Sequence, residues 1–203
     1  MYFFFDTETG GLTPDYSLLT FSAIIADRNF NVVSVHGLDP GLYLRLRYPR
    51  YNTQPRAMAI NRINLAEHDA HGFSVPEARD MLLAIVHEAC VATGERRLIP
   101  AGHNVPFDIQ FTQRYLIPQV EWGNHFAHPS LDTCAIARFF KACGLIDCDC
   151  RLGAVCEYFG IDIGNAHNAE ADSLACLRLA KEFKARMPKQ LEQFTSGRAN
   201  APA

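Results

Sequence analysis

The chain begins with an apolar run that ends in two carboxylates. Residues 2–5 read Tyr-Phe-Phe-Phe, and Asp6, Thr7 and Glu8 follow directly. This run predicts a buried strand, and because side chains alternate along a strand, Asp6 and Glu8 should point to the same face. Two like charges held side by side repel each other and lose hydration, so a folded protein compensates for them. Carboxylate oxygens suit Mg²⁺ or Mn²⁺ rather than zinc as the compensating ion.

Two later motifs supply further acids. Residues 102–108 read Gly-His-Asn-Val-Pro-Phe-Asp after a short apolar stretch, and residues 167–172 read His-Asn-Ala-Glu-Ala-Asp at the start of an amphipathic helix. Taken alone, Asp6 and Glu8 fit a metal site no better than they fit the alternatives, which are solvated acids at a strand end or an Asp that caps a turn before Gly10. The ordered set of Asp6, Glu8, Asp108 and Asp172, with His167 five residues before the last acid, favours a shared metal site.

These motifs, in this order, resemble those of the DEDDh family of 3′→5′ exonucleases. RNase T and the proofreading subunits of bacterial replicative polymerases, such as the polymerase III epsilon subunit, belong to that family. The resemblance runs from Tyr2 to about Phe183, and Asn at position 168 excludes the related subclass that carries Tyr there. It implies an α/β, RNase H-like fold with a mixed five-stranded sheet flanked by helices. Residues 1–190 would form a single exonuclease domain, and residues 191–203 a flexible tail.

The resemblance also implies roles for the acids in a two-metal site that uses Mg²⁺, with Mn²⁺ able to substitute. Asp6 would bridge both ions, Glu8 and Asp172 would bind the ion on the nucleophile side, and Asp108 would lie near the other ion through water. His167 is the candidate general base, because an imidazole titrates near neutral pH and can accept a proton from water. Taken alone, His167 would be interpreted as a surface residue beside a helix start.

Substrate contacts are expected at five further positions: Thr7, Gly11, Leu12, Asn104 and Arg62. The glycines at 10 and 11 would let the backbone approach a ligand closely. Asn61 and Arg62 replace the His-Gly pair that family members often carry there. Asp132 resembles an additional acid near the family's active site, but it fits a helix N-cap equally well. A basic stretch could bind the nucleic-acid strand away from the scissile end, or it could be a solvated loop. It contains Arg45, Arg47, Arg50 and Arg56.

Composition indicates one ordinary globular domain. The chain has 203 residues, 48% of them apolar and 20% charged, and its formal charge of −3 argues against an unspecific basic coat for nucleic acid. No stretch is long and apolar enough to cross a bilayer, and the first residues do not resemble a signal peptide.

Seven cysteines without a secretion signal indicate free thiols and a cytoplasmic location. Whether the cluster of Cys143, Cys148, Cys150 and Cys156 binds zinc stays open.

The periodicity of apolar residues predicts the remaining elements. Strands are expected at 2–7, 18–27, 30–37, 98–102 and 129–131, with a hairpin turn at 27–29. Helices are expected at 55–62, 75–93, 106–116, 133–143, 152–159 and 169–185, the second of them capped by Ser74.

The sequence therefore predicts a metal-dependent 3′→5′ exonuclease, a hydrolase that releases nucleoside 5′-monophosphates from single-stranded ends, with DNA favoured over RNA. An exoribonuclease that processes RNA ends is one alternative. A catalytically silent nucleic-acid-binding or polymerase-accessory module is the other. The chain would act alone, as a homodimer or with a polymerase, in DNA repair or proofreading, and without a membrane.

Overall fold

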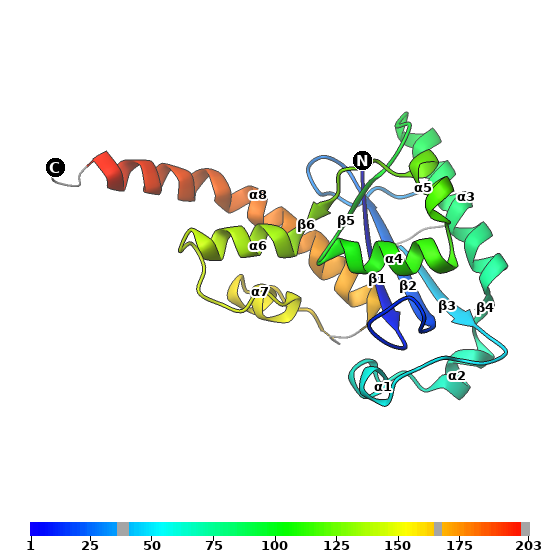
Figure 1. Ribbon diagram of the computed structural model, residues 1–203. Helices are drawn as coiled ribbons and strands as arrows, with labels where there is room; N and C mark the ends of the chain where they lie inside the picture. Colours follow the sequence, from blue (N-terminus) through cyan, green and yellow to red (C-terminus); the bar gives the residue numbers. More distant parts are fainter. Residues whose placement is uncertain (36–40, 165–167, 200–203) are drawn as a thin grey trace.

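The structure, a computed structural model, describes residues 1–35, 41–164 and 168–199, with side chains described as far as Arg186. Across these residues, one mixed sheet carries helices on both faces (Figure 1). The order of its six described strands is β4-β3-β2-β1-β5-β6. Their bounds are Tyr2–Thr9 (β1), Leu18–Ala26 (β2), Leu42–Arg47 (β3), Phe73–Ser74 (β4), Ile99–Gly102 (β5) and Leu131–Asp132 (β6).

The mixed α/β sheet is confirmed, but two details of its prediction are wrong. The sheet has six strands rather than five, because the sequence does not predict the two-residue strand β4 at one edge, whereas the short strand expected at 129–131 forms at the other edge as β6. The strand expected at 30–37 does not form in the described residues 30–35, where Val32 makes an isolated bridge to Ala26. The third strand is instead β3, whose alternating Leu-Tyr-Leu-Arg-Leu-Arg pattern buries Leu42, Leu44 and Leu46.

The described helices mostly begin where the sequence predicts. Ser74 and Glu77 form a capping box at the start of α3, and Asp132 caps α6 by accepting from the N–H groups of Cys134 and Ala135. Two short helices, α2 and α5, were not predicted, and α8 continues to Ala199 rather than ending at 185. Their bounds are Pro55–Asn61 (α1), Leu65–Ala70 (α2), Val75–Thr93 (α3), Val105–Tyr115 (α4), Gln119–His125 (α5), Thr133–Ala142 (α6), Leu152–Tyr158 (α7) and Ala169–Ala199 (α8). None of the described helices combines the length and apolar character needed to span a bilayer.

Strand β1 is buried on both faces, and the alternation of its side chains between the two faces positions the site. Phe3 and Phe5 pack into the cluster that contains residues of α3 and α4, such as Leu82 and Phe111. Phe4 faces the other way and packs against residues of α8. Asp6 and Glu8 share the parity of Phe4, so they lie on the α8 face, while Thr7 lies on the α4 face.

Core packing on β1 makes a testable contribution to stability. Phe3 is 1% exposed and touches other aromatic rings, so Phe3→Ala should lower the free energy of unfolding by about 3–5 kcal/mol. The same truncation at Phe139, whose side chain is 64% exposed, should change it by less than about 0.5 kcal/mol. Urea denaturation followed by circular dichroism measures both, and equal losses would contradict this account of the core.

Candidate active site

Three carboxylates converge where β1 meets the first turn of α8. One oxygen from each of Asp6, Glu8 and Asp172 lies within 4.8 Å of the other two, and all three residues are half-buried. Among the described residues, no other group of three or more acids, histidines or cysteines is compact enough to hold a metal ion. The structure therefore brings together three of the four predicted acids from segments more than 160 residues apart.

Asp108 lies next to this group and is held by Thr7. It is buried in the first turn of α4, and its Oδ1 accepts hydrogen bonds from the Thr7 N–H at 3.0 Å and the Thr7 hydroxyl at 2.6 Å. Strand β5 pairs with β1 only as far as Phe4, so the edge of β1 beyond that point can donate to a side chain instead. Asp108 is thus fixed to the strand that carries Asp6 and Glu8.

Burial and mutual repulsion make these carboxyl groups hard to ionise. Burial, followed by the charges of Asp108 and Asp172 and then Glu8, raises the pKa of Asp6 well above its ordinary value. Burial and the charges of Asp172 and Asp108 raise the pKa of Glu8 to about 8. Burial raises the pKa of Asp108 to about 7, although the Thr7 hydrogen bonds oppose the shift.

The donor set fits a hard divalent cation. It consists of carboxylate oxygens alone, which Mg²⁺, Mn²⁺ and Ca²⁺ prefer, and the repulsion that raises these pKa values is relieved when a cation binds. The repelling charges and the compact oxygen cluster therefore point to the same occupant.

The start of α8 sets the position of Asp172. Asn168 lies at the helix start, where its Oδ1 accepts from the Glu170 N–H at 3.0 Å and its carbonyl oxygen accepts from the Asp172 N–H at 2.9 Å. The N-terminal turn of a helix favours negative charge, which suits Asp172. Glu170 is exposed, and His167 lies outside the described residues, so its role as a base stays a prediction.

The glycine loop after β1 has a structural explanation of its own. A Cβ atom on Gly11 would lie 2.3 Å from the Tyr16 ring, and one on Gly10 would lie 2.5 Å from the Asn52 carbonyl oxygen. Both glycines are therefore required by packing within the protein, whether or not a ligand approaches. Leu12 follows with its side chain 76% exposed, so it is accessible to a substrate.

The other predicted contact residues lie in well-defined local structures. Asn104 has a φ of 66° at the start of α4, and its N–H donates to Asp132 Oδ1 at 2.9 Å. Asp132 therefore serves as the cap of α6 and as a link to Asn104. Arg62 is exposed, with a φ of 56° at the end of α1, and the neighbouring Asn61 is buried and donates to the Thr9 carbonyl oxygen. Contact of these residues with a substrate stays a prediction.

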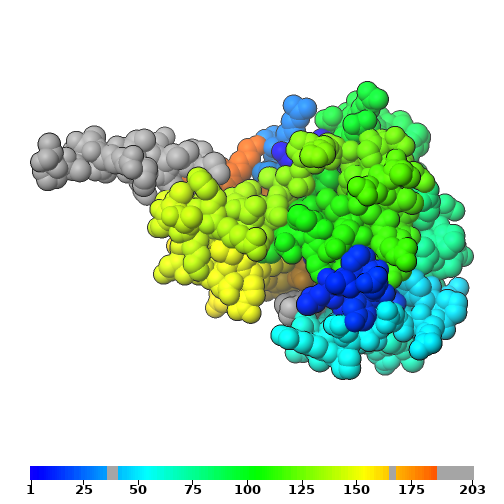
Figure 2. All heavy atoms as spheres, in the orientation of Figure 1, coloured from blue at the N-terminus to red at the C-terminus, as the bar shows by residue number. Residues whose placement is uncertain are grey.

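A cleft of about 760 Å³ opens beside the acid cluster. Asp6 and Asp172 line it, and Figure 2 shows the surface hollowed between the yellow α7 segment and the blue loop after β1, with α8 visible below. Sequence reasoning missed three cations on its wall: Arg138, Lys141 and Arg151. Their spacing carries no motif, and the sequence gives no sign that α6 and the loop before α7 reach the acids. None of the four arginines of the predicted basic stretch lines this cleft; Arg45 and Arg47 lie on β3.

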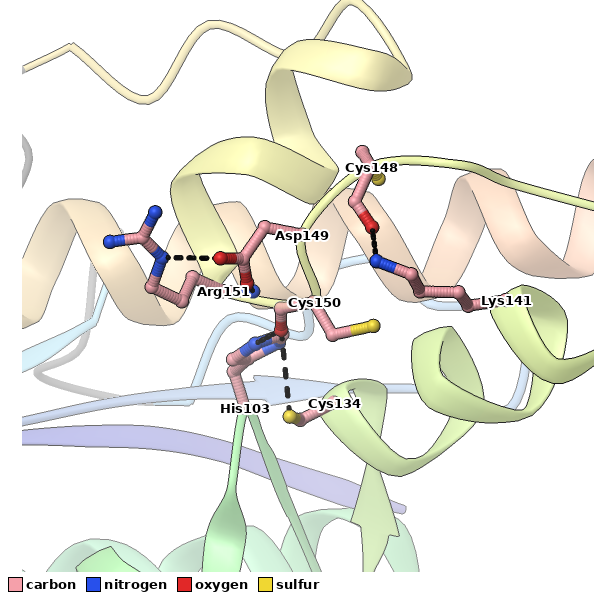
Figure 3. Close-up of polar contacts among 7 residues, drawn as sticks. All are labelled: His103, Cys134, Lys141, Cys148, Asp149, Cys150 and Arg151. Carbon is pink, nitrogen blue, oxygen red and sulfur yellow. Dashed lines mark hydrogen bonds and ion pairs between the residues drawn. The ribbon is translucent and has the colours of Figure 1, made fainter.

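His103 connects the wall of this cleft to the sheet. Its Nε2 lies 2.8 Å from the Cys150 carbonyl oxygen (Figure 3). Its Nδ1 lies 2.9 Å from Thr133 Oγ1. The cysteines around it are free thiols: Cys134 is buried with its Sγ 3.5 Å from the Cys150 carbonyl oxygen, and Cys148 packs against the apolar cluster between α6 and α8. His103 and these cysteines thus hold the loop before α7 in place.

Comparison with known proteins bears on the fold. No model of a protein family matches the sequence, and no curated protein sequence matches it. Solved structures that share the fold include those of exonucleases, and the predicted RNase H-like fold is confirmed.

These exonucleases include exonuclease I of E. coli. Its complex with a dT13 oligonucleotide has a TM-score of 0.75 at 23% identity, covering 95% of this chain and 42% of that chain. The zinc-bound form of its complex with single-stranded DNA has a TM-score of 0.76 at 24% identity, covering 96% and 42%. Exonuclease I of Methylocaldum szegediense has a TM-score of 0.73 at 23% identity, covering 93% and 41%. This chain spans less than half the length of these exonucleases.

The raised pKa of Glu8 gives a pH dependence of stability in the absence of metal. Folded Glu8 keeps its proton to about pH 8, whereas the unfolded residue loses it near pH 4.5, so the folded state binds more protons in between. Stability should therefore fall as pH rises from about 4.5 to about 8 in EDTA. Thermal melts should show a weaker fall in Glu8→Gln, whose side chain does not titrate.

Glu170→Gln is the matched control, because Glu170 is exposed beside the same helix start. This variant should retain the wild-type pH dependence of stability. Added Mg²⁺ should raise the melting temperature more at pH 8 than at pH 5, since it binds deprotonated carboxylates. An unchanged pH dependence in Glu8→Gln would contradict the assigned repulsion.

Proposed function

We propose that this protein is a metal-dependent 3′→5′ exonuclease that hydrolyses the terminal phosphodiester bond of single-stranded nucleic acid. The observation that carries the proposal is the cluster of Asp6, Glu8 and Asp172, of which Asp6 and Asp172 line a cleft, in a fold shared with exonucleases. Residues 1–190 form the proposed exonuclease domain.

Asp6, Glu8 and Asp172 would hold Mg²⁺, with Mn²⁺ able to substitute, and Asp108 would complete a site for two ions. When bound, these cations supply charge neutralisation at the phosphate and acidify a water molecule. The protein's contribution is to fix the carboxylates before the substrate arrives: β1 holds Asp6 and Glu8, and Thr7 orients Asp108. His167 is proposed as the group that takes the proton from the attacking water.

DNA is the favoured substrate. Structures of E. coli exonuclease I include complexes with dT13 and dA16 oligonucleotides and a zinc-bound complex with single-stranded DNA. RNA stays the alternative, since discrimination depends on whether the pocket accepts a 2′-hydroxyl. A partner polymerase or second copy, a cytoplasmic location and a role in DNA repair or proofreading stay predictions from the sequence.

A direct assay tests the proposal. Single strands of DNA and RNA of one sequence, labelled at the 5′ or the 3′ end, are incubated with the protein and Mg²⁺, Mn²⁺ or EDTA. Mononucleotides should leave the 3′ end stepwise with either metal and not in EDTA, faster from DNA. Absence of hydrolysis with every metal would instead support a silent binding module.

Two substitutions separate metal binding from proton transfer. His167→Ala should lower kcat by roughly 10²–10⁴-fold and leave Mg²⁺ affinity, measured by calorimetry, unchanged. Asp6→Asn should weaken Mg²⁺ binding and abolish turnover together. His128→Ala is the control, because His128 is exposed and precedes β6 at the end opposite Asp132. A His167→Ala variant with wild-type turnover would refute its role as base.

A further inference from the structure

The cleft beside the acid cluster changes charge along its length. Asp6 and Asp172 lie at one part of its lining, whereas the wall formed by α6 and the loop before α7 carries Arg138, Lys141 and Arg151. We propose that this wall, here called the α6 wall, binds backbone phosphates of the strand on the 5′ side of the scissile phosphate. The inference rests on the proposed exonuclease function and names the residues that hold the remaining strand.

Helix α6 presents two of these cations toward the cleft. Arg138 and Lys141 are three residues apart and therefore neighbours on one face of the helix. Both are exposed, while Ala137 and Phe140 are buried in the apolar cluster with α7 and α8. Packing of the buried face thus fixes the direction in which the cations project.

These cations retain unused hydrogen-bond donors. Arg138 makes no hydrogen bond or ion pair with the residues that the structure describes. Lys141 Nζ donates to the Cys148 carbonyl oxygen at 2.8 Å, which leaves two of the three ammonium donors (Figure 3). A phosphate oxygen could therefore be bound without breaking a contact.

The third cation is held in place by a carboxylate. The guanidinium Nε of Arg151 donates to Asp149 Oδ2 at 3.0 Å, and the backbone N–H of Arg151 donates to Asp149 Oδ1 at the same distance. Figure 3 shows the two terminal guanidinium nitrogens pointing away from Asp149. The α6 wall thus carries three cations and one carboxylate, in a chain whose formal charge is −3.

The chemistry of the wall fits phosphates better than bases. The described lining contains no Phe, Tyr or Trp on which a base could stack, and the ring of His103 is held at both nitrogens. An enzyme that removes one nucleotide at a time leaves every remaining phosphate on the 5′ side of the scissile bond. A cationic wall beside the acids would therefore bind the strand irrespective of its sequence, and the binding would depend on salt.

The test compares a long substrate with one that has no further phosphates. The double variant Arg138→Gln/Lys141→Gln keeps the length and polarity of both exposed side chains and removes the charges. On a dT oligonucleotide, its KM should rise roughly tenfold, and the slope of log KM against log salt should fall by about 1.4, as for two lost contacts to a single strand. On the p-nitrophenyl ester of thymidine 5′-monophosphate, its kcat/KM should equal that of the wild type.

Arg96→Gln/Arg97→Gln is the matched control. These two exposed arginines precede β5, at the end of the strand opposite His103, so the same charge is removed far from the cleft. This control should behave as the wild type on both substrates. The single charge reversal Arg138→Glu should raise the oligonucleotide KM further, and its thermal melt shows whether it remains folded.

The outcomes separate the two proposals. A wild-type protein that cleaves neither substrate refutes the exonuclease function itself. A wild-type protein that cleaves both, with an unchanged KM and salt slope in the double variant and in Arg138→Glu, refutes the α6 wall as a phosphate site. Loss of ester hydrolysis in the folded double variant also refutes it, because the wall would then act on the chemistry.

Discussion

Repulsion among the carboxylates of Asp6, Glu8 and Asp172 is the constraint to which the rest of the structure responds. A group of acids with oxygens less than 5 Å apart would move apart on a flexible scaffold. Here two of them lie on β1, where Phe3, Phe4 and Phe5 are fully buried on the two faces of the sheet. A slip of one residue in this strand would exchange the faces of all these side chains, so the core fixes the direction of the acids.

The two helices that complete the site approach β1 from opposite faces. Asp172 comes from the first turn of α8, on the face that carries Asp6 and Glu8, and Asp108 comes from the first turn of α4. The dipole of a helix favours a negative charge in its first turn, which suits both acids. Because β5 is short, the edge of β1 beyond Phe4 is open to Asp108, which accepts from the Thr7 N–H where a strand would otherwise pair. A longer β5 would keep Asp108 from this position.

Local signals allowed much of this arrangement to be predicted from the sequence. The apolar run at 2–5, the Ser74 cap and the acid motifs each depend on neighbouring residues, and they locate β1, α3, α4 and α8. The valines at 32, 33 and 35 predict a strand at 30–37, whereas the third strand of the sheet lies at Leu42–Arg47. The two-residue strand β4, which the sequence does not predict, exists only because β3 pairs with it. The position of the cations in the cleft also depends on tertiary contacts, because it is set by how α6 packs. The sequence therefore does not predict it.

The opposed charges of the cleft bear on the choice between an enzyme and a silent binding module. A site that only bound a phosphate backbone would gain from Arg138, Lys141 and Arg151. It would lose from Asp6 and Asp172, because carboxylates that line the cleft repel phosphate. Burial and repulsion already raise the pKa of Asp6 and of Glu8, so this cluster destabilises the metal-free fold at neutral pH. Bound cations would reverse both effects at once, by neutralising the cluster and by attracting the phosphate to be cleaved. The energetic cost of the acids therefore supports a metal-dependent enzyme over a module that binds and does nothing further.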